Sequence, residues 1–266
     1  MTLIRVVDTE TTGIEEPAEM VEAGWTDVHI TGSGQIIIDP SGPRSRLVRP
    51  GVPISFGAMA VHHISEAMVE AGDDPDAIRA KLAYGADILC AHNAAFDRRF
   101  IRGHNLPWIC TFKGARTVWP ELQSHSNGAI RYERGLCLHD ARAMPSHRAG
   151  PDTWITAHIL ADLLSSVSVD QLIEICNNPV LQKKVGFGEH AGKLWADVPD
   201  SYLDWILNKS TMPSDPKKED AVFTARAELA RRGVKAELPS TPSIETPDPP
   251  PAEPEKLRGG RLARRA

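Results

Sequence analysis

The sequence predicts an α/β fold for residues 1–178, because strand-like and helix-like segments alternate there. Three observations support it: short apolar runs end in polar turns, other runs alternate apolar and polar residues, and later segments carry apolar residues three and four positions apart. Apolar residues make up 41% of the 266 and charged residues 24%, so most of the chain has the composition of a folded protein.

The predicted strands come early in the chain. Leu3–Asp8 is a short apolar run that ends in a polar turn, which indicates a buried strand. Val21–Ile30 and Gln35–Asp39 alternate in polarity around the turn Thr31–Gly34, which predicts two antiparallel strands. Ile88–Ala91 is apolar throughout and predicts a central strand.

Helical patterns follow, and they divide the chain into two folded parts. Ala94–Gly103 and Asp152–Ser165 have apolar residues at helical spacing within residues 1–178. After Asn178-Pro179 a new pattern begins, with helices predicted at Ser201–Asn208 and Lys217–Arg232. We therefore expect a small second module at residues 179–235.

The composition changes again near residue 236. From there to Glu255 the chain is rich in proline and acid and can bury little apolar surface, which predicts a disordered tail at residues 236–266. The last segment, KLRGGRLARRA, carries five basic residues and no acid. A solvated tail and a weak phosphate-binding arm both fit this segment.

Charge and composition exclude several classes of protein. The net charge of −5 argues against a protein that coats nucleic acid through charge alone. No apolar run reaches the length of a membrane helix, and the first residues lack the pattern of a signal peptide, so we expect a soluble cytoplasmic protein without membrane partners. The four cysteines are far apart, which predicts reduced, mostly buried thiols.

Two acids lie two positions apart at the end of the first predicted strand. Side chains at i and i+2 of a strand share a face, so Asp8 and Glu10 should point together. Thr11-Thr12-Gly13 then predicts a tight turn. Neighbouring carboxylates repel each other, which favours a cation between them, but most triplets of this kind are solvated strand ends.

A second acid follows the strand Ile88–Ala91. Asn93 is a residue type that favours the N-cap of a helix, which would place Asp97 about one turn into that helix. Phe96 and Phe100 lie on its apolar face, so Asp97 lies on another side. This segment alone favours an ordinary surface acid.

The third candidate segment runs from His147 to Asp152. Pro151 is typical of a first helical turn, and Asp152 lies in that turn. His147 precedes it on a loop that contains glycine and proline. An acid held by a helix and a histidine on the loop before it suit a metal ligand and a general base, whereas a lone loop histidine is usually only solvent-exposed.

Together these segments resemble the DEDDh 3′→5′ exonuclease family. DTETTG, AHNAAFD and the spacing H-x₄-D occur in the family's order over about 150 residues. Ala60–Ile64 is similar to the family's segment between the first two motifs, with His63 where glycine is common. The resemblance implies an RNase H-like fold, in which a mixed five-stranded sheet has helices on both faces.

Phosphodiester hydrolysis explains why four acids and a histidine would occur together. The reaction needs an activated water, neutralised phosphate charge and a stabilised leaving group, and two divalent cations can supply all three. Oxygen ligands suit Mg²⁺ or Mn²⁺, and a histidine can take a proton near neutral pH. We expect two ions per site, held by Asp8, Glu10, Asp97 and Asp152, with His147 as the base.

Substrate contacts are implied by the resemblance alone. The backbone near Thr11 and Thr12 and the side chain of Phe96 or His92 would hold the 3′-terminal nucleotide. The arginines near the motifs fit either a solvated surface or phosphate contacts.

The second module is similar to a short module found behind the nuclease domain in the exodeoxyribonuclease X group. VGFGEHAGK predicts a hairpin, and VPDSYLDWIL predicts a helix with Tyr202 and Trp205 on one face. These aromatic residues fit the core of the module. The alternative is that His190, Lys193 and the hairpin contact nucleic acid.

The expected function is therefore metal-dependent hydrolysis of DNA from 3′ ends, with release of 5′-mononucleotides. Four alternatives remain: a polymerase proofreading subunit, an RNA-trimming exoribonuclease, a catalytically silent nucleic-acid-binding protein, and a scaffold that acts through the Pro-rich tail. All five expected catalytic positions hold competent residues, which disfavours the silent protein. The choice between DNA and RNA stays open, because a few unplaced side chains would read the 2′-hydroxyl.

Overall fold

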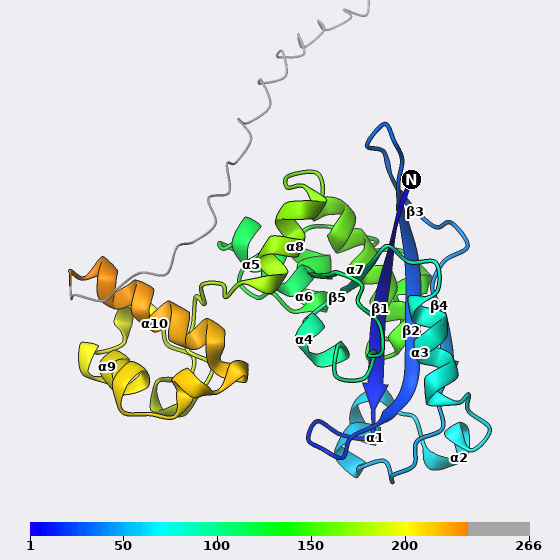
Figure 1. Ribbon diagram of the computed structural model, residues 1–266, viewed down its shortest axis with the longest axis horizontal. Helices are drawn as coiled ribbons and strands as arrows, with labels where there is room; N and C mark the ends of the chain where they lie inside the picture. The colour runs from blue at the N-terminus through cyan, green and yellow to red at the C-terminus, as the bar shows by residue number, and fades with distance from the viewer. Residues whose placement is uncertain (234–266) are drawn as a thin grey trace, which may run out of the picture.

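The computed structural model describes residues 1–233, and the predicted tail at residues 236–266 lies outside them. An α/β unit is followed along the chain by a smaller helical unit (Figure 1). The strands are β1 (Thr2–Thr11), β2 (Met20–Ile30), β3 (Ile36–Ile38), β4 (Arg44–Leu47), β5 (Ile88–Ala91) and β6 (Trp108–Cys110).

The strands form one mixed sheet in the order β3-β2-β1-β5-β6, with β4 also paired to β2. β1 is antiparallel to β2 and parallel to β5, and β5 is parallel to β6. The predicted mixed sheet is confirmed, with six strands in place of the expected five. The additional strand is β4, because β2 is long enough to pair with β3 at one end and with β4 at the other. β4 reads Arg-Ser-Arg-Leu and lacks the apolar pattern that reveals a strand.

Helices cover both faces of the sheet, and β1 shows how the two cores are divided. Ile4 and Val6 pack in the core under α7, whereas Val7 packs in the core on the opposite face, with residues of α3. In Figure 1, α3 lies on one side of β1 and β2, and α5 to α8 lie on the other. The helices of this unit are α1 (Phe56–His62), α2 (Glu66–Val69), α3 (Pro75–Ala83), α4 (Ala94–Asp97), α5 (Thr111–Val118), α6 (Asn127–Glu133), α7 (Ala149–Leu163) and α8 (Val169–Asn177), with a 3₁₀ turn, η1 (Ala141–Ala143).

The three elements that carry the candidate acids differ in their bounds from the predictions. β1 continues to Thr11, so the acids expected at its end lie within the strand. α4 ends at Asp97, before the predicted end at Gly103, because the N–H of Arg99 bonds Phe96 O at 3.2 Å, a tighter turn than that of an α-helix. α7 begins at Ala149, three residues before the predicted start, and Asp152 lies in its first turn as expected.

His63 occupies a backbone position that favours glycine. It ends α1 with φ 58°, in the left-handed region, and its N–H donates to Met59 O. This conformation explains why glycine is common at the matching position of the family. The neighbouring His62 is buried and bonds Thr11 O through Nε2 at 3.2 Å, so α1 is tied to the end of β1.

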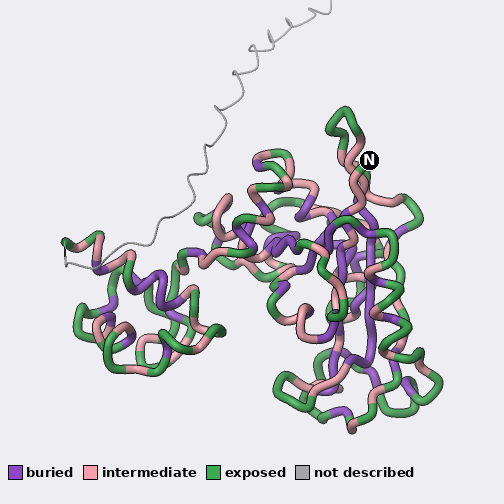
Figure 2. Tube along the Cα trace, in the orientation of Figure 1, coloured by how far each residue is buried: buried purple, intermediate pink, exposed green. Residues whose placement is uncertain are grey.

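The second unit has its own hydrophobic core. Val185, Trp195, Leu203 and Ile206 are among its buried residues, and Figure 2 shows this cluster apart from the buried strands β1 and β2. The two predicted helices are α9 (Asp200–Asn208) and α10 (Glu219–Arg231), with 3₁₀ turns η2 (Gly188–His190), η3 (Trp195–Asp197), η4 (Met212–Ser214) and η5 (Pro216–Lys218).

The remaining predictions about the chain can be tested on the described residues. All four cysteines are unpaired, and Cys90, Cys110 and Cys176 are buried, as predicted. Among residues 1–233, no helix is long and apolar enough to cross a membrane.

Candidate active site

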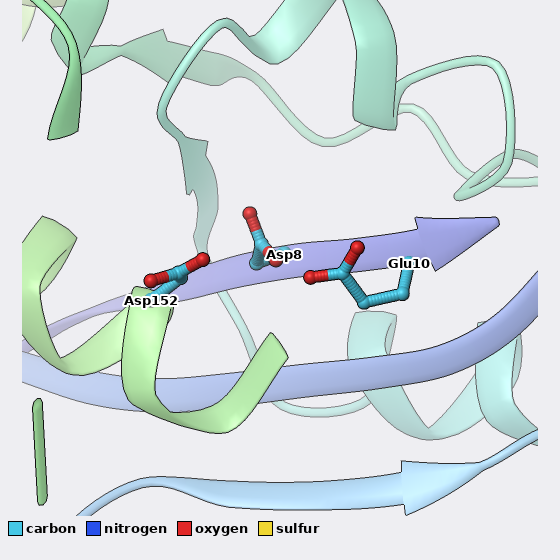
Figure 3. A group of neighbouring side chains, drawn as sticks. All are labelled: Asp8, Glu10 and Asp152. Atoms are coloured by element: carbon cyan, nitrogen blue, oxygen red, sulfur yellow. The ribbon is translucent and has the colours of Figure 1, made fainter. Parts of the chain in front are cut away.

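Asp8 and Glu10 lie on one face of β1, the face covered by α7. Alternate residues of a strand share a face, so both acids follow Ile4 and Val6, which pack in the core under α7. The two carboxylates lie side by side on β1 in Figure 3. Glu10 is paired across the strands with Glu22 of β2.

Asp152 reaches the same point from the first turn of α7. Asp8, Glu10 and Asp152 each offer one carboxylate oxygen, and these three atoms lie within 4.8 Å of one another (Figure 3). An all-oxygen donor set suits hard cations such as Mg²⁺ and Mn²⁺, whereas zinc more often takes nitrogen and sulfur. The three residues therefore fit a hard divalent cation.

Asp97 is buried beside this group. Only 2% of it is exposed, so it is not the surface acid that its segment alone favours. Thr9 Oγ1 donates to Asp97 Oδ1 at 2.8 Å, which joins α4 to β1. The preceding Asn93 adopts φ 67°, a left-handed conformation that asparagine tolerates, and its side chain makes no capping hydrogen bond. The expected N-cap position is therefore present without the expected cap.

Burial raises the pKa of every acid in the group, and the neighbouring carboxylates raise the pKa of Asp8 and Glu10 further. Burial is the largest cause in each case, and it raises the pKa of Glu10 and Asp97 to about 7 and that of Asp152 to about 6. The pKa of Asp8 lies well above its ordinary range, because burial and the charges of Asp97 and Asp152 both oppose its ionisation. A bound cation would neutralise this repulsion.

His147 lies on the loop immediately before α7. Its backbone N–H donates to Asp152 Oδ2 at 3.1 Å, and its φ is 58°. The residue is exposed, and its ring makes no hydrogen bond within residues 1–233. The backbone bond therefore places the histidine beside the acid group, with its side chain exposed to solvent.

Thr11 and Thr12, predicted to contact substrate, use their hydroxyl groups within the protein. Thr11 Oγ1 donates to Gly13 O at 2.7 Å, and Thr12 Oγ1 accepts a hydrogen bond from the N–H of Glu19 at 3.0 Å. The N–H of Thr12 donates to Glu19 O at 2.8 Å. Their role in substrate binding stays a prediction.

His92 and Phe96 were also predicted to contact substrate. His92 Nε2 donates to His125 O at 2.9 Å, which leaves Nδ1 to accept from Thr111 Oγ1 at 2.9 Å. Burial lowers the pKa of His92 to about 4, so this ring is neutral at pH 7. Phe96 is half-buried, with its ring centroid 5.2 Å from that of Phe100. The role of both residues in substrate binding stays a prediction.

Comparison with known proteins decides the family. No family model matches the chain. Exodeoxyribonuclease 10 of Escherichia coli strain K12 is 38% identical over 214 residues, which cover 77% of this chain and 91% of that protein. The chain belongs to the exodeoxyribonuclease 10 family. The solved structure of exonuclease X in complex with 5′ overhanging duplex DNA is 37% identical, with a TM-score of 0.55, and the match covers 65% of this chain and 98% of that one.

More distant relatives match over only a small part of their own length. The DNA polymerase III subunit epsilon-like protein of Rhodobacter capsulatus is 31% identical over 179 residues, but these cover only 24% of its length. The predictions of a DEDDh exonuclease of the exodeoxyribonuclease X group and of an RNase H-like fold are confirmed.

Two residues next to the acids were not predicted from the sequence. Thr9 orients Asp97, and Glu22 is a fifth acid, 1% exposed, on β2 opposite Glu10. The sequence does single out Glu22, because it is a charged residue between Val21 and Ala23 in a strand-like run. Its partner Arg148 lies 126 residues later, and no local pattern links the two.

Proposed function

We propose that this protein is a 3′→5′ exonuclease that hydrolyses DNA from 3′ ends and releases 5′-mononucleotides. The observation that carries the proposal is the carboxylate group of Asp8, Glu10 and Asp152, assembled from two of the three motifs in a chain of the exodeoxyribonuclease 10 family. Asp97, from the remaining motif, is buried beside that group and bonded to Thr9.

The four acids would hold two divalent cations, Mg²⁺ or Mn²⁺, which supply charge neutralisation at the phosphate and activation of the attacking water. The oxygen-only donors and the raised carboxyl pKa values support this assignment. Thr9 orients the Asp97 carboxylate through its hydroxyl group. His147 takes the proton from the attacking water, because histidine is the side chain that changes charge most readily near neutral pH.

Replacement of His147 by alanine tests the proposed base. We expect turnover to fall by about 10²- to 10⁴-fold, the usual contribution of a general base, while metal affinity changes little. Single-turnover kinetics at saturating metal and titration calorimetry measure the two effects. His139→Ala is the matched control, since His139 is another exposed loop histidine. A collapse of metal affinity in His147→Ala would make the histidine a ligand and overturn its assignment as the base.

The polarity and substrate of the reaction are tested with labelled oligonucleotides. Single-stranded DNA, duplex DNA and RNA of one sequence are incubated with Mg²⁺, each with a free or a blocked 3′ end, and the products are sized over time. We expect mononucleotides from DNA with a free 3′ end and none from DNA with a blocked one. Faster degradation of RNA would instead favour the RNA-trimming alternative.

The proofreading alternative has weaker support. The alignment covers 91% of exodeoxyribonuclease 10 but only 24% of the polymerase subunit epsilon-like protein. This difference favours an enzyme that acts without a polymerase. Co-purification with a polymerase subunit would contradict it.

We further propose that residues 1–178 form the nuclease domain and residues 179–235 a second module. The core of the module draws only on residues 185–229. Ion pairs link the module to the nuclease domain, with Asp220 of α10 lying 3.6 Å from both Lys113 Nζ and Arg116 Nη1. The alignment with the Escherichia coli relative covers 77% of the chain, more than residues 1–178 supply, so the relationship extends into the module.

The module presents an aromatic pair to solvent. Trp205 is 42% exposed and stacks on Tyr202, with ring centroids 5.4 Å apart, whereas Trp195 is buried in the core. His190 packs on the edge of this pair, and Lys193 Nζ lies 3.1 Å from His190 Nδ1. Exposed aromatic rings beside basic side chains suit unpaired bases, which supports a nucleic-acid contact by the module.

Loss of this surface should weaken binding of long substrates without changing the chemistry. We expect Trp205→Ala to raise KM for long single-stranded DNA about tenfold, as loss of one stacked base would, with turnover and short substrates unaffected. A chain truncated after Asn178 should behave in the same way. Tyr84→Ala is the control, because Tyr84 is an exposed aromatic residue of the nuclease domain. Unchanged KM in both variants would reassign the module to another role.

A further inference from the structure

The start of helix α7 packs against one face of β2, where it contacts three alternate residues of that strand: Glu22, Gly24 and Thr26. Gly24 permits a close approach of the two backbones, because a Cβ atom there would clash with Ala149 C and Ala149 O. Thr26 Oγ1 lies 2.9 Å from Thr153 Oγ1, and the two hydroxyl groups share a hydrogen bond. Contacts on β2 therefore set the position of the helix that carries Asp152.

Glu22 is the third of these contact residues, and its carboxylate accepts hydrogen bonds from the residues where α7 begins. Arg148 Nε donates to Glu22 Oε2 at 2.9 Å, and Arg148 Nη2 donates to Glu22 Oε1 at 2.8 Å. The N–H of Ala149, the first residue of α7, donates to Glu22 Oε2 at 3.1 Å. Arg148 occupies the N-cap position, but its side chain makes no capping hydrogen bond. The Glu22 carboxylate of β2 instead accepts the N–H of Ala149, one of the free N–H groups at the start of the helix.

These bonds hold the two residues that follow His147. The histidine is the residue before Arg148, and its own N–H is held by Asp152 Oδ2. Its φ of 58° is unusual for a residue with a side chain, so the loop must be held in this conformation from both sides. Asp152 supplies one constraint, and the Glu22–Arg148 pair supplies the other.

Glu22 could instead be a fifth metal ligand, because it faces Glu10 across the strands. Its hydrogen bonds argue against this. Both carboxylate oxygens are engaged, one by Arg148 alone and one by Arg148 and the N–H of Ala149. The ion pair also keeps Glu22 charged, as burial opposes ionisation but the Arg148 and Ala149 hydrogen bonds lower its pKa. The carboxylate of Glu22 therefore binds the start of α7 and does not serve as a metal ligand.

We propose that Glu22, through Arg148, is a positioning residue that holds His147 in place for proton transfer. The inference rests on the base role proposed above for His147. Loss of the bidentate pair would release the loop before α7, whereas the contacts of Gly24 and Thr26 would still hold the helix that carries Asp152. The expected defect is in turnover, with metal affinity and KM preserved.

The nearly isosteric Glu22→Gln variant tests this in the full-length protein. We expect kcat to fall about 10- to 100-fold, as is usual when a supporting residue is lost, with KM and Mn²⁺ affinity within about twofold. Hydrogen exchange in the peptide around residues 145–153 should accelerate. Asp27→Asn is the matched control: on the same strand, Arg5 Nε lies 2.7 Å from Asp27 Oδ1, and both side chains are 11% exposed. It should lower Tm comparably and leave kcat and exchange at residues 145–153 unchanged.

A double variant shows whether Glu22 acts through the histidine. In a His147→Ala background, Glu22→Gln should change the residual rate by less than about twofold, because the group that it positions is already absent. The same loss in both backgrounds would overturn the proposal, and so would wild-type turnover or unchanged exchange in Glu22→Gln. A collapse of Mn²⁺ affinity would make Glu22 a ligand instead. Near wild-type turnover of His147→Ala alone would identify a failure of the proposed base, separate from any result for Glu22.

Discussion

Asp8→Asn is expected to lower turnover by about 10³-fold or more, equivalent to about 4 kcal/mol of transition-state stabilisation. Asp8 lies in β1 between the other acids, and its carboxylate oxygen is one of the three atoms within 4.8 Å. Asparagine retains the shape but supplies no negative charge. A cation shared among these acids would therefore be bound more weakly and placed less well.

The same variant should fold at least as well as the wild type when metal is absent. Burial and the neighbouring charges hold the pKa of Asp8 well above its ordinary range, so ionisation of this residue costs folding free energy. Removing the charge removes that cost, and we expect an equal or higher Tm in EDTA at pH 8. Thermal unfolding and single-turnover kinetics measure the two quantities.

Asp162→Asn is the matched control for the loss of one negative charge. Asp162 lies at the far end of α7, where Arg134 Nε is 2.8 Å from its Oδ2. An exposed ion pair of this kind contributes about 0–1 kcal/mol, and its loss should leave turnover unchanged. Near wild-type turnover in Asp8→Asn would remove Asp8 from the proposed ligand set.

Local sequence patterns predicted the elements that carry the acids. Asp8 and Glu10 share a face because the period of a strand is two residues, and Asp152 lies in the first turn of a helix next to Pro151. Both predictions depend on residues within a few positions of each other. The structure agrees with them for that reason.

Contacts between distant segments could not be predicted in the same way. Asp97 resembles a surface acid in its own segment, and its burial depends on Thr9, which lies 88 residues earlier. β4 becomes a strand only because β2 offers it an edge. The pairing of Glu22 with Arg148 depends on the close approach that Gly24 permits, and a single sequence does not show which helix approaches.

Removal of divalent metal is expected to abolish activity, with a loss of at least about 10³-fold in EDTA and recovery on addition of Mg²⁺ or Mn²⁺. The reason is electrostatic. Four carboxylates lie together at the site, those of Asp8, Glu10, Asp97 and Asp152. The charge of Arg148 lowers the pKa of Glu10, but this arginine is itself paired with Glu22. Without cations, the site should repel a phosphodiester.

The effect of metal on stability should depend on pH, and the raised pKa values give its sign. The pKa of Glu10 is raised from 4.5 to about 7, so across this interval the folded metal-free protein binds more protons than the unfolded chain. Its stability therefore falls as pH rises from about 4.5 through 7. Bound cations replace those protons and remove the penalty, so the increase in Tm produced by Mn²⁺ should be larger at pH 8 than at pH 5.5.

Thermal unfolding with Mn²⁺ or EDTA at the two pH values measures this difference, and calorimetry in buffers of different ionisation enthalpy counts the protons released on binding. At pH 6.5 we expect net proton release, because the pKa of Glu10 and that of Asp97 lie near 7 in the metal-free protein. Asp8→Asn should reduce the Mn²⁺-dependent increase in Tm, whereas Asp162→Asn should leave it intact. Equal increases at both pH values, or an undiminished increase in Asp8→Asn, would show that the cation binds elsewhere, since protons and metal would then not compete for these four carboxylates.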